Sequence, residues 1–159
     1  MTDQFRKQWK KLAAGNSSDV HQAVTLASLV EKETGITAER PLIAGVFINR
    51  LNIGMRLGCD PTTIYAALLD HHPRNEIHKS DLASDNPYNT YQHDGLPPGP
   101  ITNPGADAIA AALAPADTEY LYFVAKPDGA GHQFSTSLAE HDKAVKEYRR
   151  ATKKARKAG

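Results

Sequence analysis

The chain has 159 residues, of which 40% are hydrophobic, and its formal net charge is +1. This length corresponds to about one domain, and the composition excludes both a disordered chain and a membrane bundle. Charge is segregated: residues 1–11 carry +3 (four basic, one acidic), residues 143–159 carry +7 (eight basic, one acidic) and residues 12–142 carry −9 (seven basic, sixteen acidic). The chain is an acidic body between two basic ends.

No apolar run approaches the roughly 20 residues that span a bilayer, and residues 1–14 lack the apolar segment of a signal peptide. We therefore expect neither a membrane span nor a signal peptide in this chain. The single cysteine, Cys59, excludes an intrachain disulfide and a cysteine-rich metal site.

Apolar residues at helical spacing predict a first helix over residues 5–13. A stronger helix is predicted to begin at Asp19, which can form a capping box with Gln22, and to end before Gly35. The next helix is predicted over residues 39–51, with a proline in its first turn and a glycine past its end.

Asp60-Pro61 is typical of an N-cap followed by the first helical residue, and predicts a helix to about Leu69. Asn103-Pro104 repeats this pattern for a helix to about Ala114. The stretch between them, residues 71–101, is rich in Pro, Asn, Asp, His and Gly. Loops this long inside a compact domain are usually functional or disordered. The tyrosines and recurrent prolines favour an ordered, groove-forming loop, and we expect a short helical turn at residues 80–83.

Alternating aromatic and aliphatic residues predict a strand over residues 120–125, paired with a second strand over 132–135. A capping box of Ser137 and Glu140 then predicts a terminal helix to about Lys157. This order predicts an α+β fold, a mostly helical single domain with a small antiparallel hairpin. We expect residues 1–18 to lead into the domain, residues 19–150 to form it, and residues 151–159 to be a basic helix end.

Glu31 and Glu33 end the second predicted helix, and two positions along a helix separate side chains by about 200°. They therefore cannot serve one site together. A carboxyl beside apolar side chains at a helix C-terminus favours its protonated form, which suits a general acid. Periodicity does not choose between the two glutamates, and a solvated helix end explains either of them equally well.

Ten segments resemble, in order, the catalytic domain of the endolytic murein transglycosylase family, also called MltG or YceG-like. The resemblance runs from about residue 20 to residue 150. Its segments are Leu26–Thr34, Glu39–Pro41, Val46–Leu51, Ile53–Met55, Asp60–Thr62, Tyr88–Tyr91, Gly95–Ile101, Asn103–Gly105, Tyr120–Val124 and His132–Thr136.

The resemblance implies a lytic transglycosylase-like fold and the cleavage of peptidoglycan between N-acetylmuramic acid (MurNAc) and N-acetylglucosamine (GlcNAc) without water. The family's essential glutamate falls on Glu33, which would act first as acid and then as base, leaving 1,6-anhydro ends. The resemblance further implies no cofactor, cell-wall synthases as partners, and action on the periplasmic side of the bacterial cytoplasmic membrane. Family members usually carry an N-terminal membrane anchor and a further domain, neither of which we expect in this chain.

Flat aromatic faces suit the apolar face of a sugar ring, so several aromatic residues are candidates for lining a groove, with packing as the alternative for each. Asn89 and Thr90 are candidates for hydrogen bonds to substrate or for orienting Glu33, and Asp60 is either a second groove carboxylate or simply the N-cap. The substrate-binding candidates are Asn49, Asp60, Thr62, Tyr65, Tyr88, Asn89, Thr90, Tyr91 and Phe134.

No metal site is expected. His71, His72 and His78 lie near Asp70 and Glu76 in sequence, but they match no strict metal-ligand spacing.

Three other functions compete with the lytic enzyme: a non-catalytic peptidoglycan-binding relative, a muramidase that uses water, and a binder of nucleic acid or an anionic surface through residues 143–157. The acidic charge of residues 12–142, where the motifs lie, argues against nucleic acid as a partner.

Overall fold

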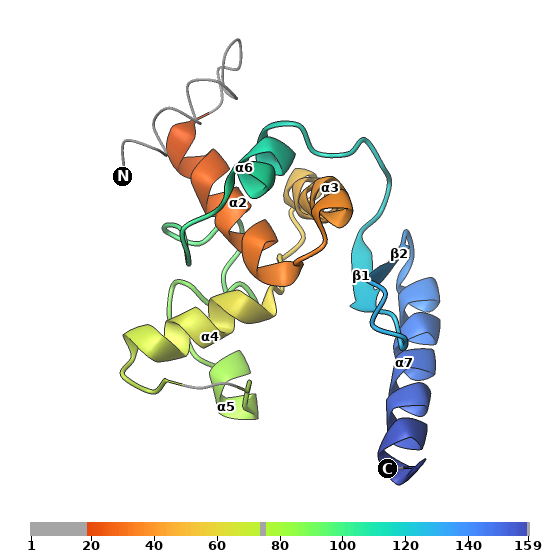
Figure 1. The fold of residues 1–159 in the computed structure, drawn as a ribbon. Coiled ribbons are helices and arrows are strands. Elements are labelled where there is room, and N and C mark those ends of the chain that lie inside the picture. The colour runs from red at the N-terminus through yellow and green to blue at the C-terminus, as the bar shows by residue number, and fades with distance from the viewer. Residues whose placement is uncertain (1–18, 74–75, 159) are drawn as a thin grey trace.

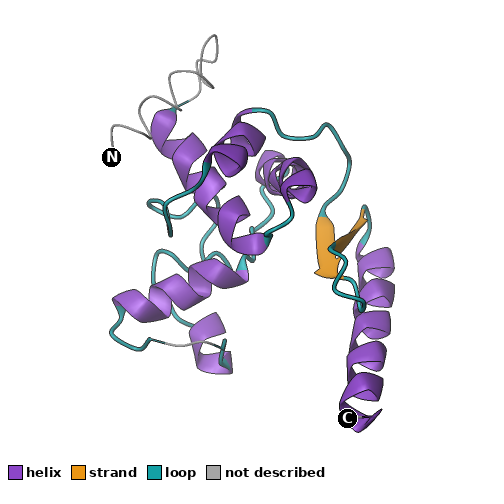
Figure 2. Cartoon of the chain, viewed as in Figure 1, coloured by secondary structure: helices purple, strands orange, loops and turns teal. Residues whose placement is uncertain are grey.

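The computed structural model describes residues 19–73 and 76–158, so the helix expected over residues 5–13 lies outside the described part. Figure 1 shows two groups of elements: a cluster of helices, and a β-hairpin that stands beside it with the last helix. The fold is mostly helical with one small antiparallel sheet, which confirms the predicted α+β class (Figure 2).

The helical cluster supplies most of the fold. Its elements are α2 (Val20–Glu33), the short 3-10 helix η1 (Thr37–Glu39), α3 (Arg40–Asn52), α4 (Asp60–Leu69), α5 (Lys79–Leu82) and α6 (Ala106–Leu113). The second group contains β1 (Tyr122–Ala125), β2 (His132–Ser135) and α7 (Leu138–Ala158). The two strands pair with Phe123 opposite Phe134.

Helices α2, α3 and α6 pack on one another and enclose the core. Small residues of α6 allow this helix to approach the other two closely, while the larger apolar side chains fill the space between them. The fully buried side chains include Leu29 and Val30 of α2, Ile43 and Phe47 of α3, and Ile109 of α6.

The hairpin is attached to the helical cluster through the end of α3. The Asn49 side-chain amide donates to the carbonyl oxygens of Thr118 (2.7 Å) and Tyr120 (2.9 Å), and Arg50 Nε donates to the carbonyl of Leu121 (2.7 Å). These bonds hold the segment that enters β1, so the hairpin is fixed at the end of α3.

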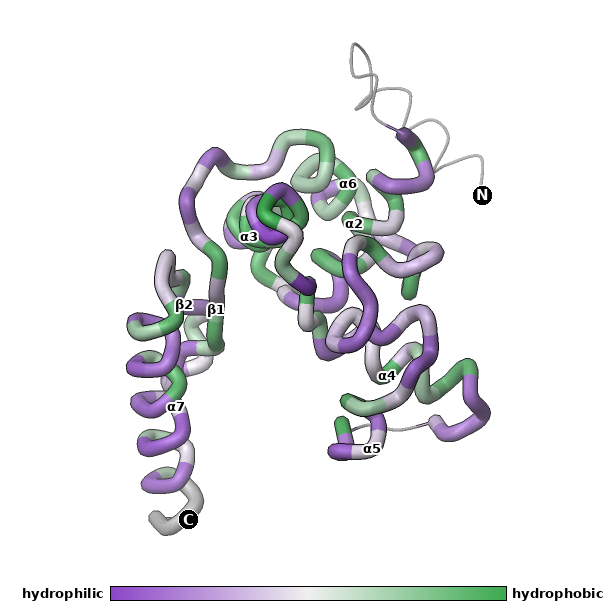
Figure 3. Tube along the Cα trace, turned by 180° about the vertical axis from the view of Figure 1, so that it is seen from behind, coloured by the Kyte–Doolittle hydropathy of each residue, from purple (hydrophilic) through white to green (hydrophobic). Residues whose placement is uncertain are grey.

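Helix α7 packs on the hairpin with its first half only. Ala144 is buried and the ring of His141 stacks on Tyr122 with centroids 5.0 Å apart. Further along, Lys146, Arg149 and Arg150 are exposed, and Figure 3 shows a largely hydrophilic helix. No helix within residues 19–73 and 76–158 combines the length and apolar character that crossing a bilayer requires.

Two predicted helix starts are wrong by one or two residues. Helix α6 begins at Ala106 with Gly105 as N-cap, not at the Asn103-Pro104 pair, because the Glu31 carboxylate accepts the Gly105 N–H (2.9 Å) and supplies the cap from another helix. In α4, the N-cap is Cys59 and Asp60 is already helical. The first strand also starts later than predicted, at Tyr122.

Gly45 marks a close approach between α3 and the segment that leaves α6. A Cβ atom at this position would lie 2.6 Å from the carbonyl oxygen of Ala116. This contact is closer than real Cβ atoms tolerate, so only glycine allows the segment to run along α3.

We therefore expect Gly45→Ala to lower the free energy of unfolding by about 1–3 kcal/mol through overpacking, although alanine favours a helix interior by roughly 0.5–1 kcal/mol over glycine. Urea unfolding measures this difference. Gly35→Ala is the matched control, because a Cβ there meets no atom within 4 Å. A Gly45→Ala protein at least as stable as the wild type would contradict the close approach.

Candidate functional site

Glu33 is the last residue of α2 and points toward the start of α4, where Figure 1 shows the two helices meeting. The Cys59 thiol donates a hydrogen bond to Glu33 Oε1 (3.0 Å). Burial raises the pKa of Glu33, and the negative charge of Asp60 raises it further. The Cys59 hydrogen bond and the electrostatic interactions with His132 and Arg50 oppose this rise without cancelling it. The side chain therefore holds its proton to higher pH than an exposed glutamate, as a general acid requires.

Asp60 and Tyr91 form a pair beside Glu33. The Tyr91 hydroxyl donates a short hydrogen bond to Asp60 Oδ1. Burial is the main cause that raises the pKa of Tyr91, and Asp60 adds to it, so the hydroxyl stays protonated as a donor. The N-cap interpretation of Asp60 is wrong, since its carboxylate accepts from Tyr91 rather than from the start of its own helix.

Glu31 is turned away from this site, as the 200° separation on α2 predicts. Its Oε1 pairs with Arg40 Nη2 (3.1 Å), and its Oε2 accepts the Gly105 N–H (2.9 Å). Both carboxylate oxygens are therefore engaged in holding α3 and α6 to α2. The structure distinguishes the two glutamates where periodicity does not.

Thr62, Asn89 and Thr90 are buried beneath the loop instead of facing its surface. The Asn89 amide donates to the carbonyls of Ser84 (2.7 Å) and Asp81 (3.1 Å), and its oxygen accepts the Tyr91 N–H (3.1 Å). Their direct contact with substrate, expected from the sequence, stays a prediction. They fix the loop that carries Tyr91.

Asn49 is likewise engaged inside the protein. Both hydrogen bonds of its side-chain amide reach backbone carbonyls ahead of β1. In this structure it attaches the hairpin, and the substrate contact expected from the sequence stays a prediction.

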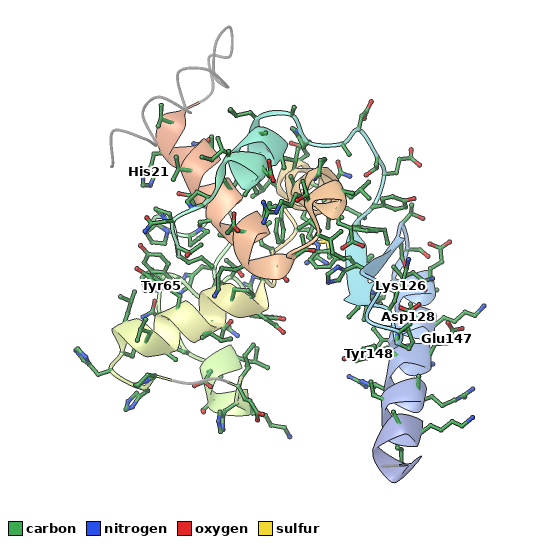
Figure 4. All side chains as sticks on the ribbon, viewed as in Figure 1. His21, Tyr65, Lys126, Asp128, Glu147 and Tyr148 are labelled. Atoms are coloured by element: carbon green, nitrogen blue, oxygen red, sulfur yellow. The ribbon has the colours of Figure 1, made fainter. Side chains whose placement is uncertain are left out.

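The aromatic candidates do not form one group. Tyr65 and Tyr88 contact each other with ring centroids 4.9 Å apart, and Phe134 lies 5.5 Å from Tyr120 on the hairpin. Figure 4 shows the Tyr65 side chain, which projects from α4, on the same side of the molecule as His21 at the start of α2. Of these candidates, Tyr91 is the one that interacts electrostatically with Glu33; sugar contacts by the other three stay predictions.

Glu39 and His132 form a second pair near Glu33 that sequence reasoning missed. Glu39 Oε1 accepts the backbone N–H of His132 (2.7 Å), and its Oε2 lies 2.8 Å from His132 Nδ1. Burial acts to raise the pKa of Glu39, but the hydrogen bonds from His132 outweigh it and lower the pKa. The only signal in the sequence was that both residues fall within motifs of the family resemblance.

Two hollows lie away from Glu33. One, of about 370 Å³, lies between β2 and α7 and is bordered by Phe134 and Lys143; the other, of about 290 Å³, lies between α4 and α5 and is bordered by Thr63 and Ser80. Among the residues that the structure describes, no three or more His, Cys, Asp or Glu side chains gather closely enough to hold a metal ion.

The YceG-like family model matches residues 1–147, which is most of the chain. The chain therefore belongs to the YceG-like family, and the resemblance of the sequence motifs is confirmed. Its sequence is 44% identical over 147 residues to the endolytic murein transglycosylase of Bacillus subtilis (strain 168), covering 92% of this chain and 40% of that protein.

Two further relatives agree with this membership. The endolytic murein transglycosylase of Streptococcus pneumoniae serotype 2 is 39% identical over 131 residues, covering 81% of this chain and 24% of that protein. A crystal structure of a YceG-like protein from Listeria monocytogenes superposes with a TM-score of 0.78 at 41% identity, covering 89% of this chain and 45% of the other. The chain thus spans less than half the length of these relatives.

The raised pKa of Glu33 has a consequence for stability. A carboxyl whose folded-state pKa lies above its unfolded value stabilises the fold fully below the ordinary value of 4.5, and this stabilisation is lost as pH rises through the raised pKa. We therefore expect Glu33→Gln to be more stable than the wild type near pH 7, with the advantage shrinking toward pH 4. The glutamine oxygen can still accept from the Cys59 thiol.

Thermal unfolding of both proteins across this pH range measures the difference. The control is Glu31→Gln, which breaks the pair with Arg40 and is expected to lower stability by about 1–3 kcal/mol. A stability advantage of Glu33→Gln that did not change with pH would show that Glu33 has no raised pKa.

Proposed function

We propose that this chain is the catalytic portion of a lytic endotransglycosylase that cleaves peptidoglycan glycan strands between MurNAc and GlcNAc. One observation carries the proposal: Glu33 is a half-buried carboxyl whose pKa is raised by desolvation, in a chain that belongs to the YceG-like family. The curated relatives with 39–44% identity are named endolytic murein transglycosylases, which supports murein as the substrate.

The reaction needs a single group that acts twice. Protonated Glu33 gives its proton to the glycosidic oxygen, the bond from that oxygen to C1 of MurNAc breaks, and an oxocarbenium-like centre forms at C1. The Glu33 carboxylate then takes the proton of the C6 hydroxyl of the same sugar. The C6 oxygen bonds to C1 as a 1,6-anhydro ring, so no water is consumed and Glu33 ends protonated.

The proposal also extends to place and partners. Peptidoglycan lies outside the bacterial cytoplasmic membrane, so we propose that the enzyme acts on the periplasmic side of that membrane. Cell-wall synthases would supply new strands for such an enzyme and are the partners that the proposal implies. No cofactor enters the proposed steps.

A water-using muramidase is the second candidate, and Asp60 is the observation that favours it. Hydrolysis at a glycosidic bond generally uses two carboxyl groups on either side of it. Asp60 is exposed and interacts electrostatically with Glu33, so it is available as a second carboxylate.

Digestion of purified peptidoglycan, with mass analysis of the released ends, tests the proposal. We expect ends that are one water lighter than hydrolysed ends, and a loss of about 10²–10⁴-fold in rate for Glu33→Gln because the general acid is gone. Glu31 is on the same helix but turned away from the site. The Glu31→Gln protein should therefore cleave at the wild-type rate under conditions in which it is folded. Hydrated ends would favour the muramidase, and intact strands would favour a non-catalytic binding protein.

A further inference from the structure

Cys59 makes an unusual contact for a buried cysteine. It is 1% exposed, and its thiol lies 3.0 Å from Glu33 Oε1. Asp60, Tyr91, Arg50 and His132 also surround the Glu33 carboxyl electrostatically. Within residues 19–73 and 76–158, however, the Cys59 thiol is the one side-chain donor that is hydrogen-bonded to this carboxyl.

The backbone of Cys59 is fixed from two sides. Its N–H donates to Thr90 Oγ1 (2.9 Å), and its carbonyl oxygen accepts from Thr62 Oγ1 (2.7 Å). The two threonine hydroxyls lie 2.8 Å apart and are buried, so they tie the loop to α4. These bonds fix the backbone of Cys59, so the position of its thiol relative to Glu33 is fixed as well.

An apolar residue would fill this site as well as cysteine if packing were the only requirement. The position is the N-cap of α4, but its side chain makes no capping hydrogen bond. The thiol, at the start of α4, instead donates a hydrogen bond to Glu33 at the end of α2. This contact joins the loop, through Thr90 and Cys59, to the carboxyl that the proposed reaction uses.

We infer that Cys59 is a positioning residue, whose S–H holds Glu33 Oε1 so that Oε2 is left to exchange the proton with the substrate. The inference rests on the proposed function of Glu33. A thiol suits the task because it is a weak donor that makes the carboxylate easier to form without removing the proton needed at the start. Burial raises the pKa of the Cys59 thiol well above its usual range, so the thiol remains a donor throughout the working pH range.

Two substitutions test this role in opposite directions. Cys59→Ala removes the donor, so the pKa of Glu33 should rise above its wild-type value. The alkaline limb of the pH profile of kcat/KM should then move to higher pH, and the maximum should fall on the order of tenfold, as expected for one lost hydrogen bond to a charged group. Cys59→Ser restores a donor and should recover most of the rate. Its alkaline limb should lie at the wild-type pH or at a lower pH.

The pKa of Glu33 is also measured without activity, by carbon NMR titration of its labelled carboxyl in the full chain. Ile109→Val is the control, because it removes a methyl group from the core at α6, away from Glu33. It should leave both the carboxyl titration and the pH profile unchanged.

The inference is overturned if Cys59→Ala leaves the Glu33 titration and the alkaline limb unmoved, even if the rate falls. The same holds if Cys59→Ser behaves as Cys59→Ala. Failure of the proposed function looks different: the wild type would release no anhydro ends, or Glu33→Gln would cleave at the wild-type rate. An upward shift of the Glu33 titration in Cys59→Ala, reversed in Cys59→Ser and matched by the alkaline limb of the pH profile, supports the inference.

Discussion

The partial burial of one carboxyl group, that of Glu33, is the constraint around which this protein is arranged. A charged carboxylate removed from water is costly unless it is paired or hydrogen-bonded, so the surrounding chain must supply donors or leave the group protonated. The structure does both in part. Burial and Asp60 favour the proton, whereas the Cys59 thiol and the charges of His132 and Arg50 favour the carboxylate. These groups come from α3, the start of α4 and β2, so the helical cluster and the hairpin both take part in one site.

The loop over residues 86–101 depends on buried hydrogen bonds rather than on a hydrophobic core of its own. A segment without regular secondary structure must satisfy its backbone groups elsewhere. The Asn89 side chain accepts the Tyr91 N–H within the loop and donates to the carbonyls of Asp81 and Ser84 just ahead of it. The Gly58 N–H donates to the carbonyl of Thr90 (3.1 Å), which binds the loop to the chain entering α4. The order of the loop is thus a consequence of polar side chains that the sequence suggests for substrate binding. The side chains of Asn89 and Thr90 hold the loop in place, and Tyr91 is the loop residue that lies beside Glu33.

The helices with apolar stripes and proline or glycine boundaries could be predicted from the sequence, because those signals are local. The start of α6 could not, since its cap is the Glu31 carboxylate of another helix, 74 residues earlier in the chain. The site shows the same division. Periodicity narrowed the choice to Glu31 and Glu33, and the family resemblance selected Glu33. Cys59 and the pair of Glu39 and His132 have no local signal, because their contacts join residues 26 and 93 positions apart. Only the folded chain brings such partners together.

A carboxyl that must act first as acid and then as base works best when neither form is strongly favoured. Burial alone would hold the proton too firmly for the second step, and a strong ion pair would release it before the first. The surroundings of Glu33 avoid both extremes, because among the described residues no lysine or arginine is hydrogen-bonded to it and its one hydrogen-bond donor is a thiol. Arg50 illustrates the point: its Nη1 donates to the carbonyl of Leu57 (2.6 Å) and its Nε to that of Leu121, so its charge acts on Glu33 only from a distance. The carbonyls of Leu57 and Leu121, the second of which anchors the hairpin, therefore also keep the Arg50 guanidinium from fixing Glu33 in its charged form.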